Sequence, residues 1–102
     1  MAQWKAVAKT SEVTPRQGKQ VVVDGQNIAL FNLDGKFCAI QDECAHAGGS
    51  LSEGELSGNV VTCPWHGATF DVTCGKVLTE PAYEDVKSYK VKIEDGEILV
   101  EI

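Results

Sequence analysis

The chain has 102 residues, and 9 Lys and Arg against 15 Asp and Glu give it a net charge of −6. This length suits one domain and excludes a two-domain enzyme with its own nucleotide-binding half. The apolar content of 43% excludes wholesale disorder, no apolar run approaches the roughly 20 residues that span a bilayer, and the acidic balance excludes nucleic acid as a favoured partner.

β-strand patterns run along most of the chain. The first expected strand is 4–8, and the N-terminus before it has no apolar segment, so we expect no secretion signal and a cytoplasmic protein. A polar connection follows at 11–18. Asp-Gly pairs at 24–25, 34–35 and 95–96 are strong signals for two-residue hairpin turns. They predict strands at 20–23, 26–33, 36–40, 89–93 and 97–102.

The middle of the chain breaks this rhythm. It holds six glycines and two loop-like pieces, with short expected strands only at 59–62 and 69–72. The sequence therefore predicts one all-β domain over 1–102, an antiparallel sandwich or barrel, with a loop-rich subdomain inserted at roughly 42–82.

The two loops of the insert carry Cys44 and His46, and Cys63 and His66. These are the only histidines of the chain, and each lies close to a cysteine. Thiolate and imidazole together suit zinc, iron or copper, so the pattern predicts one metal centre with four protein ligands. Because each arm mixes Cys with His, the pattern favours a dinuclear centre, one iron bound by both cysteines and the other by both histidines. A structural zinc site is the alternative.

The spacing C-x-H-x₁₆-C-x₂-H resembles the signature of Rieske [2Fe–2S] domains. The resemblance extends to Gly48-Gly49, to the Cys-Pro-Trp-His-Gly run, to Phe70-Asp71 and to Glu80-Pro81. With the surrounding β pattern it covers essentially the whole chain. It implies a Rieske-like fold whose inserted subdomain binds one [2Fe–2S] cluster through Cys44, His46, Cys63 and His66. It also implies that Trp65, Gly48 and Pro81 pack over the cluster and that the His-bound iron lies nearest the surface.

The implied function is transfer of single electrons. The chain resembles the ferredoxin component of aromatic-ring-hydroxylating dioxygenase systems, in which a flavin-dependent reductase supplies electrons and a terminal oxygenase receives them. We expect no catalysis, since an oxygenase needs a second iron bound by two histidines and a carboxylate, and both histidines are already assigned. We expect a monomer that binds neither membranes nor nucleic acid.

Two other functions remain open at this point. The first is a Rieske-type small subunit of a nitrite reductase, which is part of an enzyme rather than a free carrier. The second is a structural zinc module without redox activity.

The remaining cysteines are given no cluster role. Cys38 lies in an expected strand and should be buried, whereas Cys74 precedes a glycine and should lie in a turn. The resemblance implies no disulfide between the cluster loops, because the positions of that pair are taken by Gly49, or a neighbour of it, and by Trp65. It also implies that Ala68 and Phe70 replace the Ser and Tyr that donate hydrogen bonds in high-potential Rieske proteins.

The charge is unevenly distributed along the chain. Residues 37–75 contain no Lys or Arg but carry five acids: Asp42, Glu43, Glu53, Glu55 and Asp71. The stretch is either a solvated acidic face or a surface that attracts a basic partner.

Overall fold

Antiparallel strands account for nearly all regular structure in the computed structural model, which describes residues 3–42, 50–64, 68–78 and 85–101. The strands are β1 (Trp4–Lys9), β2 (Gly18–Val23), β3 (Gln26–Leu33), β4 (Lys36–Gln41), β5 (Glu55–Ser57), β6 (Val60–Thr62), β7 (Thr69–Asp71), β8 (Ser88–Tyr89), β9 (Val91–Glu94) and β10 (Glu97–Glu101). The described residues also form two 3₁₀ turns, η1 (Thr10–Glu12) and η2 (Leu51–Glu53). The all-β prediction is confirmed.

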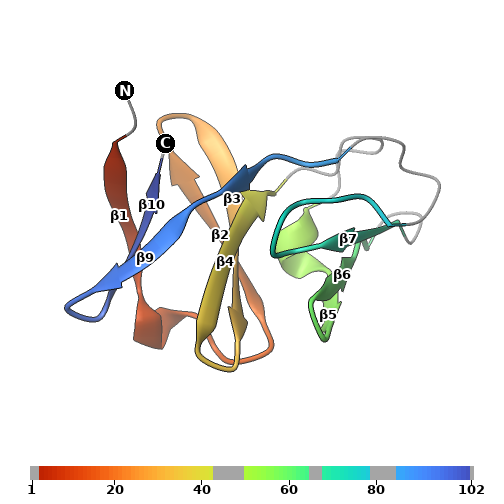
Figure 1. The fold of residues 1–102 in the computed structure, drawn as a ribbon, viewed down its shortest axis with the longest axis horizontal. Helices are drawn as coiled ribbons and strands as arrows, with labels where there is room; N and C mark the ends of the chain where they lie inside the picture. The colour runs from red at the N-terminus through yellow and green to blue at the C-terminus, as the bar shows by residue number, and fades with distance from the viewer. Residues whose placement is uncertain (1–2, 43–49, 65–67, 79–84, 102) are drawn as a thin grey trace.

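The strands form three sheets (Figure 1). The outer sheet has the order β1-β10-β9, the central sheet β2-β3-β4-β8, and the small sheet β5-β6-β7. All the strand pairs are antiparallel. The small sheet is formed by residues from the middle of the chain, so the outer and central sheets combine strands from both ends of the sequence.

The central sheet contributes to two hydrophobic cores. On β3, Ile28 and Leu30 pack in the core shared with the outer sheet, whereas Ala29 and Phe31 pack in the core shared with the small sheet. All four are wholly buried. Successive side chains of a strand point to opposite faces, so a continuous apolar run is what a strand covered on both sides requires.

The three Asp-Gly turns have the backbone that the sequence predicts. Asp24, Asp34 and Asp95 have φ of 49°, 56° and 49°, and the glycine after each also has positive φ. Positive φ at both central residues defines the type I′ turn, whose twist matches that of a two-stranded ribbon. The hairpins β2–β3, β3–β4 and β9–β10 follow from these turns.

Two details differ from the sequence-based expectation. The strand expected over 89–93 is divided, because Tyr89 pairs with Ala39 in the central sheet while Val91 pairs with Val100 in the outer sheet. The alternation of apolar and polar residues continues across this change of sheet, so the pattern does not reveal it. The sequence also does not predict β5, whose three residues include only one half-buried apolar side chain, Leu56.

Polar contacts join the small sheet to the central sheet. The Arg16 guanidinium donates to the Gly58 carbonyl at 2.9 Å and lies 3.5 Å from the Asp34 carboxylate. Gly18 lies so close to η2 that a Cβ would approach the Ser52 carbonyl oxygen to 2.7 Å. The small sheet is therefore held against the central sheet by these contacts as well as by the shared core.

Candidate metal centre

The second cysteine of the motif lies directly after β6. Cys63 is 1% exposed, and its N–H donates to the Ala68 carbonyl at 2.7 Å. On the strands themselves Thr62 pairs with Thr69. The hairpin β6–β7 therefore closes the second loop between 63 and 68. Cys44, His46 and His66 lie outside the described residues.

The first loop is closed by Asp42, which is 1% exposed. The Asp42 carbonyl accepts from the Leu51 N–H at 2.6 Å. The carboxylate accepts from Gln20 Nε2 at 2.6 Å, Ser50 Oγ at 2.8 Å and the Ser52 N–H at 2.8 Å. These bonds hold the two ends of the loop together and fix them to β2. Sequence reasoning counted Asp42 only as one of the five acids and missed this role.

The ends of both loops lie in one hydrophobic core. Leu51, from the end of the first loop, packs in the cluster that contains Cys63 and Ala68, from the two ends of the second. Phe31 and Ile40 of the central sheet belong to the same cluster. The structure therefore brings the ends of the two loops together, as a metal centre shared by the predicted ligands would require.

A third segment begins and ends beside β7. The Leu78 N–H donates to the Thr69 carbonyl, and the Val77 N–H donates to Asp85 Oδ1, both at 2.9 Å. Pro81 lies in the segment between them and is outside the described residues, as are Trp65 and Gly48, so their expected packing over the cluster stays a prediction.

The described part of the site suits an iron–sulfur cluster. The Cys63 thiol forms no disulfide, and it lies among buried apolar side chains that limit access of water. Ala68 and Phe70 beside it are wholly buried and have no side-chain donor. The described residues alone contain no group of three or more metal-binding side chains, because three of the four predicted ligands fall outside them.

The other two described cysteines lie where the sequence predicts. Cys38 is buried within β4, and desolvation raises the pKa of its thiol, which therefore stays protonated and unreactive at neutral pH. Cys74 is exposed in the turn after β7. Neither forms a disulfide.

The acidic stretch divides into buried and exposed groups. Asp42 is buried, while Glu53 and Glu55 are exposed beside the small sheet. Asp71 accepts hydrogen bonds from the Thr73 hydroxyl and N–H at 2.6 and 2.9 Å, and these bonds lower the pKa of its carboxyl. Glu43 lies outside the described residues. The exposed charge therefore comes from fewer groups than the sequence suggests.

Comparison with known proteins identifies the family. Residues 3–90 match the model of the Rieske [2Fe–2S] domain. The chain belongs to the Rieske family. This Rieske chain is 46% identical to the biphenyl dioxygenase ferredoxin subunit of Pseudomonas sp. (strain KKS102), over 88% of its own length and 84% of that protein.

Solved structures agree with this assignment. The ferredoxin of carbazole 1,9a-dioxygenase from Nocardioides aromaticivorans IC177 superposes with a TM-score of 0.92 and 28% identity, covering 96% of each chain. A chain in a complex of reduced oxygenase and oxidized ferredoxin in carbazole 1,9a-dioxygenase gives a TM-score of 0.88 and 33% identity, over 95% of this chain and 91% of that one. The Rieske fold and the [2Fe–2S] cofactor that the resemblance implied are confirmed.

These relatives identify the Rieske chain as an electron-transferring ferredoxin rather than a catalyst. A nitrite reductase (NADPH) small subunit also superposes, with a TM-score of 0.82, but at 22% identity it shares the fold alone. Among the described residues, no helix is long and apolar enough to cross a bilayer.

Proposed function

We propose that the chain carries single electrons to the terminal oxygenase of an aromatic-ring dioxygenase system. The observation that carries this proposal is the 46% identity, over most of both chains, to the ferredoxin subunit of a biphenyl dioxygenase. The solved complex of an oxygenase with a related ferredoxin supports the choice of partner. The electrons would come from a flavin-dependent ferredoxin reductase, and we propose that the carrier acts as a monomer in the cytoplasm. Its free thiols suit a reducing compartment.

The cluster ligands are proposed to be Cys44, His46, Cys63 and His66. Cys63 supports the assignment, because its thiol is buried at the closed base of the second loop. The bound cluster supplies one-electron chemistry. The chain's own residues hold it, exclude water through the core around Cys63 and Phe70, and keep two imidazoles available for a partner. Residues of roughly 42–82, which include the small sheet, are proposed to form the cluster-binding subdomain.

Elemental analysis of the purified protein tests the cofactor and its ligands. Two irons and two acid-labile sulfides per chain are expected, together with a rhombic EPR signal after reduction. Cys63→Ser should abolish both, whereas Cys74→Ser, the matched change at the exposed cysteine, should leave both unchanged. One zinc without labile sulfide would instead support the structural zinc module.

A stopped-flow experiment tests the function itself. Chemically reduced protein is mixed with the oxidised terminal oxygenase of a biphenyl dioxygenase, and reoxidation of the ferredoxin is followed by absorbance. Stoichiometric reoxidation is expected. Failure to reduce the oxygenase, combined with co-purification with a large sirohaem subunit, would support the nitrite reductase function instead.

A further inference from the structure

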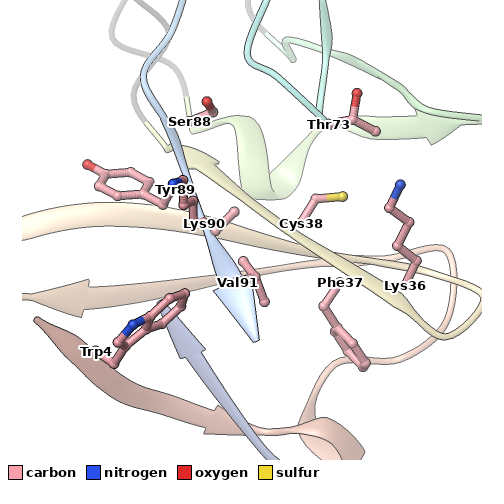
Figure 2. A pocket seen from close by; sticks show the side chains of 10 residues that line it. Trp4, Lys36, Phe37, Cys38, Thr73, Ser88, Tyr89, Lys90 and Val91 are labelled. Carbon is pink, nitrogen blue, oxygen red and sulfur yellow. The ribbon is translucent and has the colours of Figure 1, made fainter. Parts of the chain in front are cut away.

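A recess of about 560 Å³ opens where β4 and β9 diverge (Figure 2). It exists because the chain leaves the central sheet after Tyr89 and enters the outer sheet at Val91, so that the second half of this segment turns away from β4. The recess is lined by apolar and aromatic side chains, by two lysines and by two hydroxyls: Trp4, Phe37, Tyr89, Lys36, Lys90 and, among others, Thr73 and Ser88.

Main-chain groups of β4 face this recess. Phe37 pairs with Asn32 across β3 and β4. Asn32, however, directs its N–H to the Gln17 carbonyl at 3.3 Å and its carbonyl to the Arg16 N–H at 2.8 Å, away from β4. Asn32 and Phe37 are therefore a non-hydrogen-bonded pair of the antiparallel ladder. In such a pair the backbone groups of both residues point away from the partner strand, so the N–H and carbonyl of Phe37 point to the edge of β4 that faces away from β3.

No described strand occupies that opposite edge at Phe37. β8 pairs with β4 only at Ala39 and Ile40, and the strand that follows belongs to the outer sheet. One donor and one acceptor of the β4 backbone are thus presented to the recess. An exposed sheet edge of this kind is a template for an added strand.

The lining of the recess carries positive charge in an acidic protein, with the Asp71 carboxylate within electrostatic reach of Lys36. Its lining includes Lys36 and Lys90 and no Asp or Glu. Lys92 lies beside it, with its Nζ 4.6 Å from the centroid of the Trp4 ring, but it is ion-paired with Glu94 at 3.2 Å. Lys87, with its Nζ 5.0 Å from the centroid of the Tyr89 ring, lines a separate recess. In a chain of net charge −6, a lining with two lysines and no acid favours an anionic occupant.

We propose that this recess is a docking site for an extended acidic segment of a partner protein. The segment would pair with the N–H and carbonyl of Phe37 as a short added strand. Its alternate carboxylates would lie toward Lys36 and Lys90, and its apolar side chains would contact Trp4. The recess lies on β4, β8 and β9 and not on the closed bases of the two ligand loops, so a segment bound there leaves the cluster available. The site thus goes beyond electron transfer itself.

The test uses the cluster-loaded, oxidised protein and a probe peptide of about ten residues that alternates Glu and Val. Binding is followed by ¹⁵N chemical-shift changes at Lys36, Phe37 and Lys90 and at the Trp4 indole. Exchange of the Phe37 amide with deuterium should slow by at least about tenfold in the saturated complex. A peptide of the same charge with Pro in place of each Val should bind at least about fivefold more weakly, because it cannot form a strand pair.

Matched variants separate the recess from general charge attraction. Lys36→Gln with Lys90→Gln should raise the Kd of the probe peptide about fivefold or more. Lys9→Gln with Lys76→Gln, which removes two exposed lysines outside the recess, should change the Kd less than about twofold. Circular dichroism and the cluster absorbance check that both variants fold.

Three results would each overturn the proposal: unchanged exchange at Phe37, equal loss of binding in the two double variants, or equal shifts from free succinate at the same carboxylate concentration. The first excludes an added strand, the second shows that the effect is total charge, and the third shows that the lysines collect small anions.

Discussion

Ala68 is hydrogen-bonded through its backbone to Cys63, the one predicted ligand that lies among the described residues. Its carbonyl accepts the Cys63 N–H, and both residues are buried in the same core. The Ala68 side chain is a methyl group and Phe70 carries no hydroxyl, so neither can donate a hydrogen bond to a cluster sulfur. The potential of a Rieske cluster depends on such donors, on net charge and on solvent exposure. The lack of a side-chain donor at these two positions favours the low end of the range of Rieske potentials, about −150 mV.

Ala68→Ser should raise this potential. A donor to sulfur stabilises the more negative reduced cluster, and if about 1.5 kcal/mol of the bond is specific to that state, the shift is roughly 65 mV. Protein-film voltammetry measures the potentials of wild type and variant. Ala39→Ser, a change of the same kind in the other hydrophobic core, should leave the potential unchanged. A lowered potential in Ala68→Ser would contradict the assignment of this position.

Asp42 contributes to stability through its acceptors. In Asp42→Ala, the Ser52 N–H and the Gln20 amide lose their partner in a buried place, which should lower the free energy of unfolding by about 2–4 kcal/mol in urea titration. The variant should also lose its visible absorbance faster in the presence of an iron chelator. Asp24→Asn, at an exposed pair with Lys5 3.8 Å apart, should cost less than about 1 kcal/mol. If the two changes lowered the free energy of unfolding equally, the hydrogen bonds of Asp42 at the base of the first loop would not be important for stability.

Among the structural elements, the turn after β7 depends on Gly75. Its φ is +79°, a Cβ there would collide with the Val86 carbonyl oxygen, and its own carbonyl accepts the Val86 N–H at 2.8 Å. Gly96 has nearly the same φ, +77°, but no atom near its would-be Cβ.

Gly75→Ala should therefore destabilise the protein more than Gly96→Ala. In Gly96→Ala the only penalty is that alanine must adopt a left-handed backbone conformation, which should lower the free energy of unfolding by about 1–2 kcal/mol. In Gly75→Ala the new Cβ must also displace Val86, so the free energy of unfolding should fall by about 3 kcal/mol or more. Urea unfolding at equal protein concentration measures both. Equal losses would show that the backbone around Val86 yields without cost.

Local rules predict most of the strands. The three Asp-Gly turns fix the registers of their hairpins, and the apolar run of β3 indicates burial on both faces. The change of sheet after Tyr89 is different, because it depends on which strand pairs with β4 and not on the pattern of the segment itself. The three-residue strand β5 has too few apolar positions to give a periodic pattern.

The site shows the same division. The spacing of cysteines and histidines predicts the centre, because metal chemistry restricts residue type and loop length. The partners of Asp42 could not be predicted, since Gln20, Ser50 and Ser52 come from separate parts of the chain and meet only after folding. A buried acid and an exposed acid look alike in a sequence.

At the scale of the molecule, the charges are separated between surfaces. Lysines border the recess between β4 and β9, while Glu53 and Glu55 are exposed beside the small sheet. The loop between β6 and β7 holds the predicted ligand His66, so if the oxygenase surface is basic, we expect these acids to attract it to the end of the molecule that holds the predicted cluster.

Glu53→Lys with Glu55→Lys should slow association with the oxygenase at low ionic strength by about tenfold or more, with little change in the cluster spectrum. The difference from wild type should shrink as salt is raised, because exposed charges are screened beyond about 10 Å at 0.1 M. Stopped-flow rates across a salt series measure both effects. Glu94→Lys with Glu97→Lys, the same charge change on the β9–β10 hairpin, is the control. If the association rate of the first variant equalled that of the wild type, the acids would be a solvated surface without a role in binding the oxygenase.

The double burial of β3 has a consequence for cooperativity. Ala29 and Phe31 pack in one core, while Ile28 and Leu30 pack in the other. If either core came apart, one face of β3 would be exposed to water. Heating should therefore melt the protein in a single calorimetric transition, and the β3 amides should exchange with deuterium only through global unfolding. A damaged small sheet would weaken the outer sheet as well. The predicted cluster site and the sheets around it should therefore share one melting temperature.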